Sequence, residues 1–92
     1  MVSLDGAAIA MDTEHTGHRY QTTRGSDVPR DGTFLELVVD GHTARPVMEA
    51  FFSDETGALT INTFERASIP LEIVREFTAE AERLLPPASE TP

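Results

Sequence analysis

The sequence predicts an α+β fold in which a small antiparallel β-meander of three to five strands carries one C-terminal amphipathic helix on one face. Two observations lead to this class. Apolar residues recur every three or four positions near the C-terminus, and runs of β-forming residues separated by short turns precede them. Consecutive strands joined by short loops pair as an antiparallel meander, and a closing helix packs across it. The 92 residues suffice for one domain.

The helix is predicted over Ile69–Leu85. Ser68 is the expected N-cap, and Pro70 fits the first turn because its missing N–H would be unpaired there. The residues before Pro86 and Pro87 avoid the α region, so the helix should end at that point. Its apolar stripe consists of Pro70, Ile73, Val74, Phe77, Ala81, Leu84 and Leu85.

Three strands are predicted before the helix, at Thr33–Val39, Val47–Phe52 and Ala58–Glu65. Asp40-Gly41 is a strong turn dipeptide and begins the first connection. Ser53–Gly57 is the second connection, a hairpin loop in which Gly57 is free to take positive φ.

The N-terminal third is expected to add a hairpin. Residues 7–12 alternate in the way of a short strand, residues 19–23 are a second candidate, and residues 15–18 form the turn between them. Residues 24–32 contain two glycines, a proline and two aspartates, and they are predicted to be a loop. The single domain therefore spans residues 1–85, and the proline-rich residues 86–92 are predicted to be a disordered tail.

The chain is strongly acidic. Its formal net charge is −9, and Asp31–Glu65 holds seven acidic residues against Arg45 alone, a net of −6. Phosphate binding needs clustered basic residues, so this charge argues against nucleic acids and anionic membranes and suits a basic protein partner. The absence of cysteine excludes disulfides and thiolate zinc sites. Without a basic and apolar N-terminal signal or a long apolar run, the cytoplasm is the expected location.

Strand alternation divides the predicted sheet into two faces. The face that receives the helix should carry Leu35, Leu37, Val39, Met48, Ala50, Phe52, Leu59 and Ile61. The second face mixes aromatic and β-branched residues with carboxylates and an amide. Its members are the predicted partner-binding residues: Phe34, Glu36, Val38, Val47, Glu49, Phe51, Asn62 and Phe64. Three coverings of this face are open: the N-terminal hairpin, a second copy of the chain, or a foreign partner.

No catalytic, cofactor or metal site is predicted. Glu36 and Glu49 face each other across neighbouring strands like an acid–base pair, but opposed carboxylates also occur on solvated sheets. His15 and His18 have the spacing of a chelate, yet Gly17 between them favours a solvated turn. No glycine-rich phosphate loop is present.

Arg19, Arg24 and Arg30 form the only basic stretch. Three arginines in an acidic chain make a weak nucleic-acid contact. We expect this segment to act as an electrostatic complement, lying against the acidic sheet or a second subunit.

The function predicted from these features is that of a small, acidic, non-catalytic binding protein. The preferred form is a stoichiometric inhibitor of the immunity-protein or antitoxin type that neutralises a basic partner enzyme. A phage-type inhibitor whose carboxylates imitate nucleic-acid phosphates is one alternative. A homodimeric structural or accessory domain, paired through the second sheet face, is the other.

Overall fold

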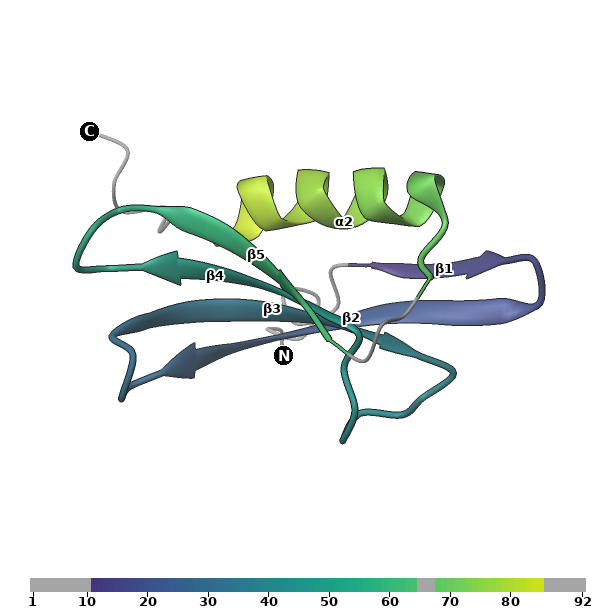
Figure 1. Cartoon of the computed structure of the whole chain (residues 1–92), viewed down its shortest axis with the longest axis horizontal. Helices are drawn as coiled ribbons and strands as arrows, with labels where there is room; N and C mark the ends of the chain where they lie inside the picture. Colours follow the sequence, from purple (N-terminus) through teal and green to yellow (C-terminus); the bar gives the residue numbers. More distant parts are fainter. Residues whose placement is uncertain (1–10, 65–67, 86–92) are drawn as a thin grey trace, which may run out of the picture.

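The computed structural model describes residues 11–64 and 68–85, which form one five-stranded antiparallel sheet and one helix (Figure 1). The strands lie in the order β1-β2-β3-β4-β5, so each pairs with its neighbour in the sequence. The predicted α+β meander with a C-terminal helix is therefore confirmed. The elements are β1 (Asp12–His15), β2 (His18–Asp27), β3 (Gly32–Val39), β4 (Met48–Ser53), β5 (Leu59–Thr63) and α2 (Leu71–Leu84).

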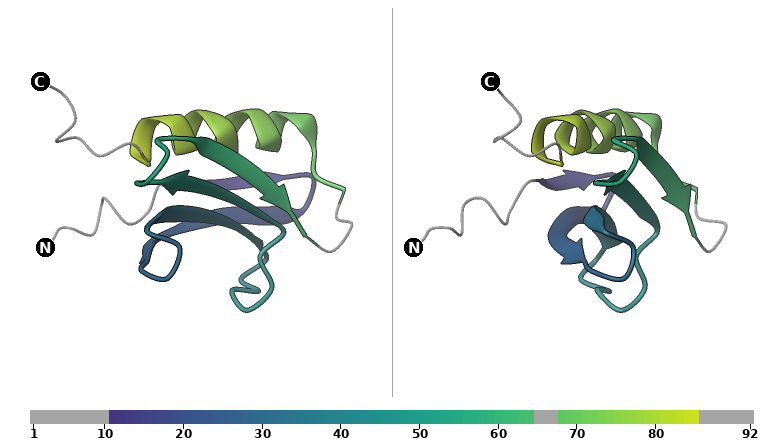
Figure 2. Two further views of the ribbon diagram at one scale, coloured as in Figure 1. Left: turned by 60° about the vertical axis from the view of Figure 1, so that its left-hand side comes forward. Right: turned by 90° about the vertical axis from the view of Figure 1, so that its left-hand side faces the viewer.

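The described residues form two layers. Helix α2 lies over one face of a strongly twisted sheet, and no described element lies over the other face in the views of Figure 2. No helix in the described part of the chain is long and apolar enough to cross a membrane.

The core fills the space between the helix and the sheet. Phe77 is completely buried and Ile73 nearly so, because both lie on the predicted apolar stripe of α2. The sheet contributes the residues that strand alternation predicted for the helix-facing side, with one exception. Ile61 in β5 remains 43 % exposed. The buried cluster comprises Met11, Tyr20, Leu35, Leu37, Met48, Ala50, Phe52, Ile73, Phe77, Ala81 and Leu85.

Polar contacts fix the direction of the helix relative to the sheet. The Thr13 hydroxyl donates to Glu76 at 2.7 Å, and His15 Nε2 lies 3.0 Å from Glu72 Oε1. The helix therefore runs antiparallel to β1 with one flank above that strand. Its opposite flank faces the β5 side of the sheet.

The start of the helix differs from the prediction. Pro70 is the N-cap, and its carbonyl accepts the N–H groups of Ile73 and Val74, each at 3.0 Å. No side chain caps the helix. Ser68 stands two residues too early, because an N-cap side chain reaches only the second or third residue of the first turn.

An N-terminal hairpin is present, as predicted, but its boundaries differ. Its two-residue turn is Thr16-Gly17, where φ is 47° and 87°, and His15 pairs directly with His18. Positive φ at both positions is typical of a type I′ turn, whose twist matches the flanking strands. Most of the strand predicted at residues 7–12 lies outside the described residues, as does the predicted tail at 86–92.

Strand β2 extends through residues 24–27, where a loop was predicted. The segment pairs with β3, from Arg24↔Leu35 to Asp27↔Gly32. A Cβ at Gly25 would lie only 2.6 Å from the tip of the Phe34 ring, so the glycine makes room for that ring within the sheet. Gly25 is therefore needed because the Phe34 ring lies close to its backbone, and it does not mark a turn of the chain.

The hairpin extends the sheet and does not fold over its second face. β2 pairs along the whole edge of β3, from Tyr20↔Val39 to Asp27↔Gly32. Backbone pairing of this length holds residues 12–27 in the plane of the sheet. Of the three coverings left open, the described part of the hairpin, residues 12–27, is therefore not one.

The remaining turns follow the prediction. Asp40 and Gly41 adopt φ of 52° and 78°, and Gly57 adopts 75°. At the second connection, the Gly57 N–H donates to the Ser53 carbonyl at 2.8 Å. Strands β3, β4 and β5 begin and end within one or two residues of the predicted positions.

Substitution of Gly32 should be among the most destabilising changes in the sheet. A Cβ at Gly32 would lie 2.1 Å from the backbone carbonyl oxygen of Phe52, and a backbone atom cannot yield without distorting β4. We expect Gly32→Ala to lower the free energy of unfolding by about 3 kcal/mol or more. Gly25→Ala is the matched comparison, since the Phe34 ring can rotate away, and it should cost clearly less. Urea unfolding measures both, and equal losses would contradict the prediction.

Candidate functional site

The second face of the sheet centres on two cross-strand pairs between β3 and β4. Glu36 lies directly opposite Glu49, and Phe34 lies opposite Phe51. Opposed side chains in an antiparallel pair are close neighbours on the same face. The predicted juxtaposition of the two carboxylates is therefore confirmed.

Arg30 reaches from the β2–β3 turn onto this face and neutralises one of the two carboxylates. Its Nη2 and Nη1 donate to Glu49 Oε2 at 2.6 Å and Oε1 at 3.2 Å, and its Cζ lies 4.1 Å from the centroid of the Phe51 ring. Asn62 Nδ2 adds a third hydrogen bond to Glu49 Oε1 at 3.3 Å. Glu49 is only 5 % exposed, and these contacts make burial of its charge tolerable.

The local sequence of the turn aims the arginine. The Asp27 carboxylate accepts the backbone N–H of Arg30 and also its Nε–H, at 3.2 and 2.5 Å. Asp31 adopts a φ of 57°, and its backbone N–H closes the turn by donating to the Val28 carbonyl. The hydrogen bonds that the Arg30 guanidinium donates to Glu49, and then those it donates to Asp27, raise its pKa. The same arginine lowers the pKa of Asp27.

Glu36 is left without such compensation. Among residues 11–64 and 68–85 it has no hydrogen-bond or ion-pair partner. Burial raises the pKa of its carboxyl, the neighbouring charge of Glu49 raises it further, and Arg30 offsets part of the rise. The second face therefore carries one carboxylate, that of Glu36, whose charge no direct partner among the described residues balances.

The predicted partner-binding residues divide into two groups. Val38 is 1 % exposed and Glu49 is 5 % exposed, so both are buried and offer almost no contact surface. Val47 was placed on the wrong face: it precedes β4, where strand alternation no longer applies, and it packs against the helix-side core. The residues within the strands that remain at least partly accessible are Phe34, Glu36, Phe51 and Asn62, which we call the open face. Phe64 is 37 % exposed, but it follows the end of β5 and its backbone N–H bonds to Val47, so strand alternation does not place it on this face.

The basic stretch behaves as predicted at one position. Arg30 lies against the acidic sheet, whereas Arg19 pairs with Asp12 of β1 at 2.7 Å. Arg24 is exposed on β2. The electrostatic complement that the sequence predicted is thus carried by Arg30.

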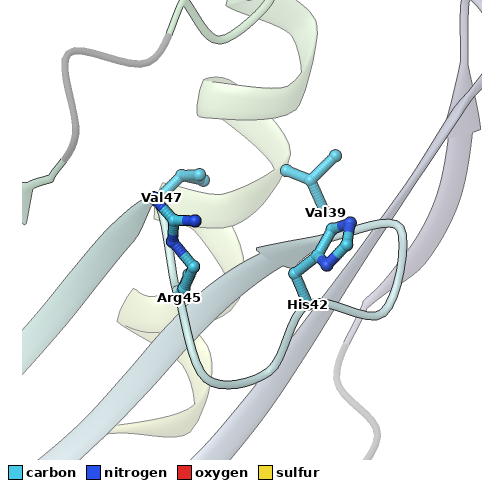
Figure 3. A pocket seen from close by; sticks show the side chains of 4 residues that line it. All are labelled: Val39, His42, Arg45 and Val47. Carbon is cyan, nitrogen blue, oxygen red and sulfur yellow. The ribbon is translucent and has the colours of Figure 1, made fainter.

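Sequence reasoning missed a hollow on the helix side of the sheet. A pocket of about 240 Å³ is lined by Val39, His42, Arg45 and Val47. In Figure 3, Val39 and His42 lie on one side of this pocket, and Val47 and Arg45 lie on the other. A neighbouring pocket of about 290 Å³ shares both valines and adds His18, Tyr20, Ser68 and Ile69. The residues that line the first pocket all lie in or directly beside the connection between β3 and β4, whereas the second pocket joins residues 18–20 and 68–69 to it, which no local pattern in the sequence predicts.

The histidines of the N-terminal turn serve as hydrogen-bonding groups. His15 contacts Glu72, while His18 Nδ1 lies 2.7 Å from Asp40 Oδ2. The Arg19 backbone N–H, followed by His18, lowers the pKa of Asp40. Within the described ranges, no group of three or more histidines and carboxylates is placed to hold a metal ion.

The arrangement suits recognition of a cation better than proton transfer. Both oxygens of the Glu49 carboxylate are occupied by hydrogen bonds from Arg30 and Asn62. Glu36, with the Phe34–Phe51 pair beside it on the same face, can accept a guanidinium or ammonium group from outside. Ser53 is also engaged locally, since its Oγ accepts the Thr56 N–H at 3.2 Å.

No protein-family model, curated protein or solved structure matches this chain.

Removal of Arg30 should destabilise the fold by stranding the Glu49 carboxylate. We expect Arg30→Ala to lower the free energy of unfolding by about 2 kcal/mol, because a buried charge would lose its bidentate partner. Arg24→Ala removes an exposed arginine from the adjoining strand and should change stability by less than about 0.5 kcal/mol. Urea unfolding of both variants provides the measurement.

A double variant shows how much of the stability lost in Arg30→Ala is due to the unpaired charge of Glu49 and how much to lost packing. Arg30→Ala with Glu49→Gln should regain part of the lost stability, because the remaining side chain is neutral. If the double variant is as unstable as the sum of the two single variants, the electrostatic explanation fails.

The ionisation of Glu36 should make the protein less stable as pH rises. Its folded pKa lies above the ordinary value of 4.5, so the folded state resists losing this proton. Stability is lost as pH rises from the unfolded value through the folded pKa. Glu36→Gln should therefore raise Tm at neutral pH and leave it nearly unchanged at about pH 3, below the ordinary glutamate range. Thermal unfolding of both proteins at the two pH values checks this, and a benefit seen only in acid would contradict it.

Proposed function

We propose that the chain is a small, acidic, non-catalytic binding protein that inhibits a basic partner enzyme stoichiometrically, in the manner of an immunity protein or antitoxin. The observation that carries the proposal is the state of Glu36. This carboxylate lies at the centre of the open face without a direct partner in the described residues. A lysine or arginine from another protein would supply the missing countercharge.

The surroundings of Glu36 favour a strong contact. Glu49 beside it is already neutralised by Arg30, so an incoming cation would be directed to Glu36. Partial burial raises the pKa of Glu36, and the same low-dielectric setting strengthens its attraction to a cation that excludes water. Pairing with a cation would thus offset the free-energy cost of keeping the Glu36 charge partly buried.

Aromatic side chains provide the apolar part of the interface. Phe34 and Phe51 lie opposite each other on the open face and are partly buried. Arg30 stacks on Phe51 and immobilises that ring before a partner arrives. Prearranged aromatic groups around a desolvated charge pair are typical of the residues that dominate binding energy.

Long-range charge would assist the encounter. A net charge of −9 attracts a basic protein over a distance comparable to the Debye length, about 8 Å at physiological salt. This attraction accelerates association, and it weakens as salt is added.

Titration of the purified chain against a basic protein encoded by a neighbouring gene tests the proposal. We expect a one-to-one complex with a dissociation constant of about 1 µM or less, and Glu36→Gln should weaken it by about tenfold or more. Glu82→Gln is the control, because it removes the same charge from an exposed position on α2. Calorimetry provides the affinities, and thermal unfolding verifies that the variants are folded.

Two results would overturn the proposal: no complex at micromolar concentration, or equal loss of affinity in the two variants. Displacement of the chain from its target by duplex DNA would instead support the nucleic-acid-mimicking inhibitor.

A further inference from the structure

The two edges of the sheet differ in a way that bears on assembly. Edge β1 has four residues, of which Asp12 and Glu14 are charged. Short length and charge are devices that prevent one sheet edge from pairing with another. Edge β5 lacks both proline and charge, and the chain from Thr56 through Phe64 contains no charged residue. In a chain with 25 % charged residues, this neutral edge is open to pairing.

The hydrogen-bond pattern shows which backbone groups β5 presents outward. The Phe64 N–H donates to Val47, and the Ala58 carbonyl accepts from Ser53, so the even-numbered residues bond to β4. Bonding alternates along an antiparallel edge strand. The N–H and C=O groups of Leu59, Ile61 and Thr63 therefore point away from the sheet.

An apolar surface accompanies these groups on the helix side. Ile61 pairs with Ala50, so its side chain lies on the face that carries α2, yet it is 43 % exposed. Leu71 at the start of α2 is 60 % exposed. By helical geometry, Leu71 and Val74 lie on the flank opposite Glu72 and Glu76, which face β1. That flank overlooks the β5 side of the sheet.

We propose that β5 is a homodimer interface, where it pairs antiparallel with β5 of a second copy about a two-fold axis at Ile61. In this register, Ile61 faces its own counterpart and Leu59 faces Thr63. All three residues present outward backbone groups, so each exchanges both hydrogen bonds with its counterpart. The two sheets become one continuous sheet without an exposed edge at the seam.

Charge identifies a second copy as the occupant. Two molecules of net charge −9 repel each other, and β5 is an edge where they can meet without opposing like charges. A basic partner would be expected to contact carboxylates, and this strand offers none. The two-fold axis is perpendicular to the sheet, so both helices lie on one side, and their exposed flanks overlook the seam where the two Ile61 side chains meet.

This dimer is independent of the proposed inhibitory function. The open face lies on the side of the sheet opposite α2, so dimerisation through β5 leaves both copies of Glu36 accessible. A chain that dimerises without binding a basic enzyme, or the reverse, would separate the two proposals.

Sedimentation analysis of the wild-type chain and two variants tests the interface. At on the order of 100 µM, a concentration chosen because an edge-strand interface is small, the wild type should have twice the 10.1 kDa chain mass. Ile61→Lys places two ammonium groups at the axis and should weaken the dimer at least about tenfold. Thr60→Lys, whose side chain lies on the opposite face of the same strand, should remain largely dimeric.

Amide exchange keeps the test decisive if a variant is poorly stable. In the wild-type dimer, the amides of Leu59, Ile61 and Thr63 should exchange slowly, and dilution to monomer should make them fast while Thr60 and Asn62 stay protected. A monomeric wild type, a dimeric Ile61→Lys, or rapid exchange at the three outward amides of the dimer would overturn the proposal. Added salt should strengthen the dimer by screening the repulsion between its copies.

Discussion

One helix of fourteen residues has to cover a sheet of five strands, and the rest of the structure depends on how the chain treats the area that α2 leaves uncovered. The helix buries its stripe against the middle of the sheet, where Leu35, Leu37 and Ala50 are fully inaccessible. The second face and the β5 edge lie beyond its reach. A small domain cannot bury everything, because too much of its chain lies at the surface.

Among the described residues, a polar contact and not a second layer stabilises the second face. Arg30 covers Phe51 with its guanidinium and neutralises Glu49, so one side chain supplies both shielding and charge balance. Such a pair contributes little net stability, because desolvation offsets most of the Coulomb attraction. Its effect is specific: Arg30 contacts Glu49 and Phe51, and Glu36 has no direct partner among the described residues.

Local patterns in the sequence were enough to predict the layers, and they failed where tertiary contacts decide. Alternation assigned Leu35, Leu37 and Met48 to the helix side because the period of a strand is independent of its surroundings. The same rule misplaced Val47, which lies just before β4. The length of β2 was missed because Gly25 serves the Phe34 ring, a contact between strands that no local signal reveals. The division of roles between Glu36 and Glu49 depends on the direction of Arg30, and only the folded turn sets it.

The open face and the β5 edge differ in the chemistry that would satisfy them. The open face has aromatic rings around a carboxylate, so its complement carries positive charge. The edge has unpaired backbone groups beside exposed aliphatic side chains, so its complement is another neutral strand. Their separation on different sides of the molecule allows both to be occupied at once. A dimer would then display two open faces on the side away from its helices, and a target with two basic sites would bind it more tightly than it binds one chain.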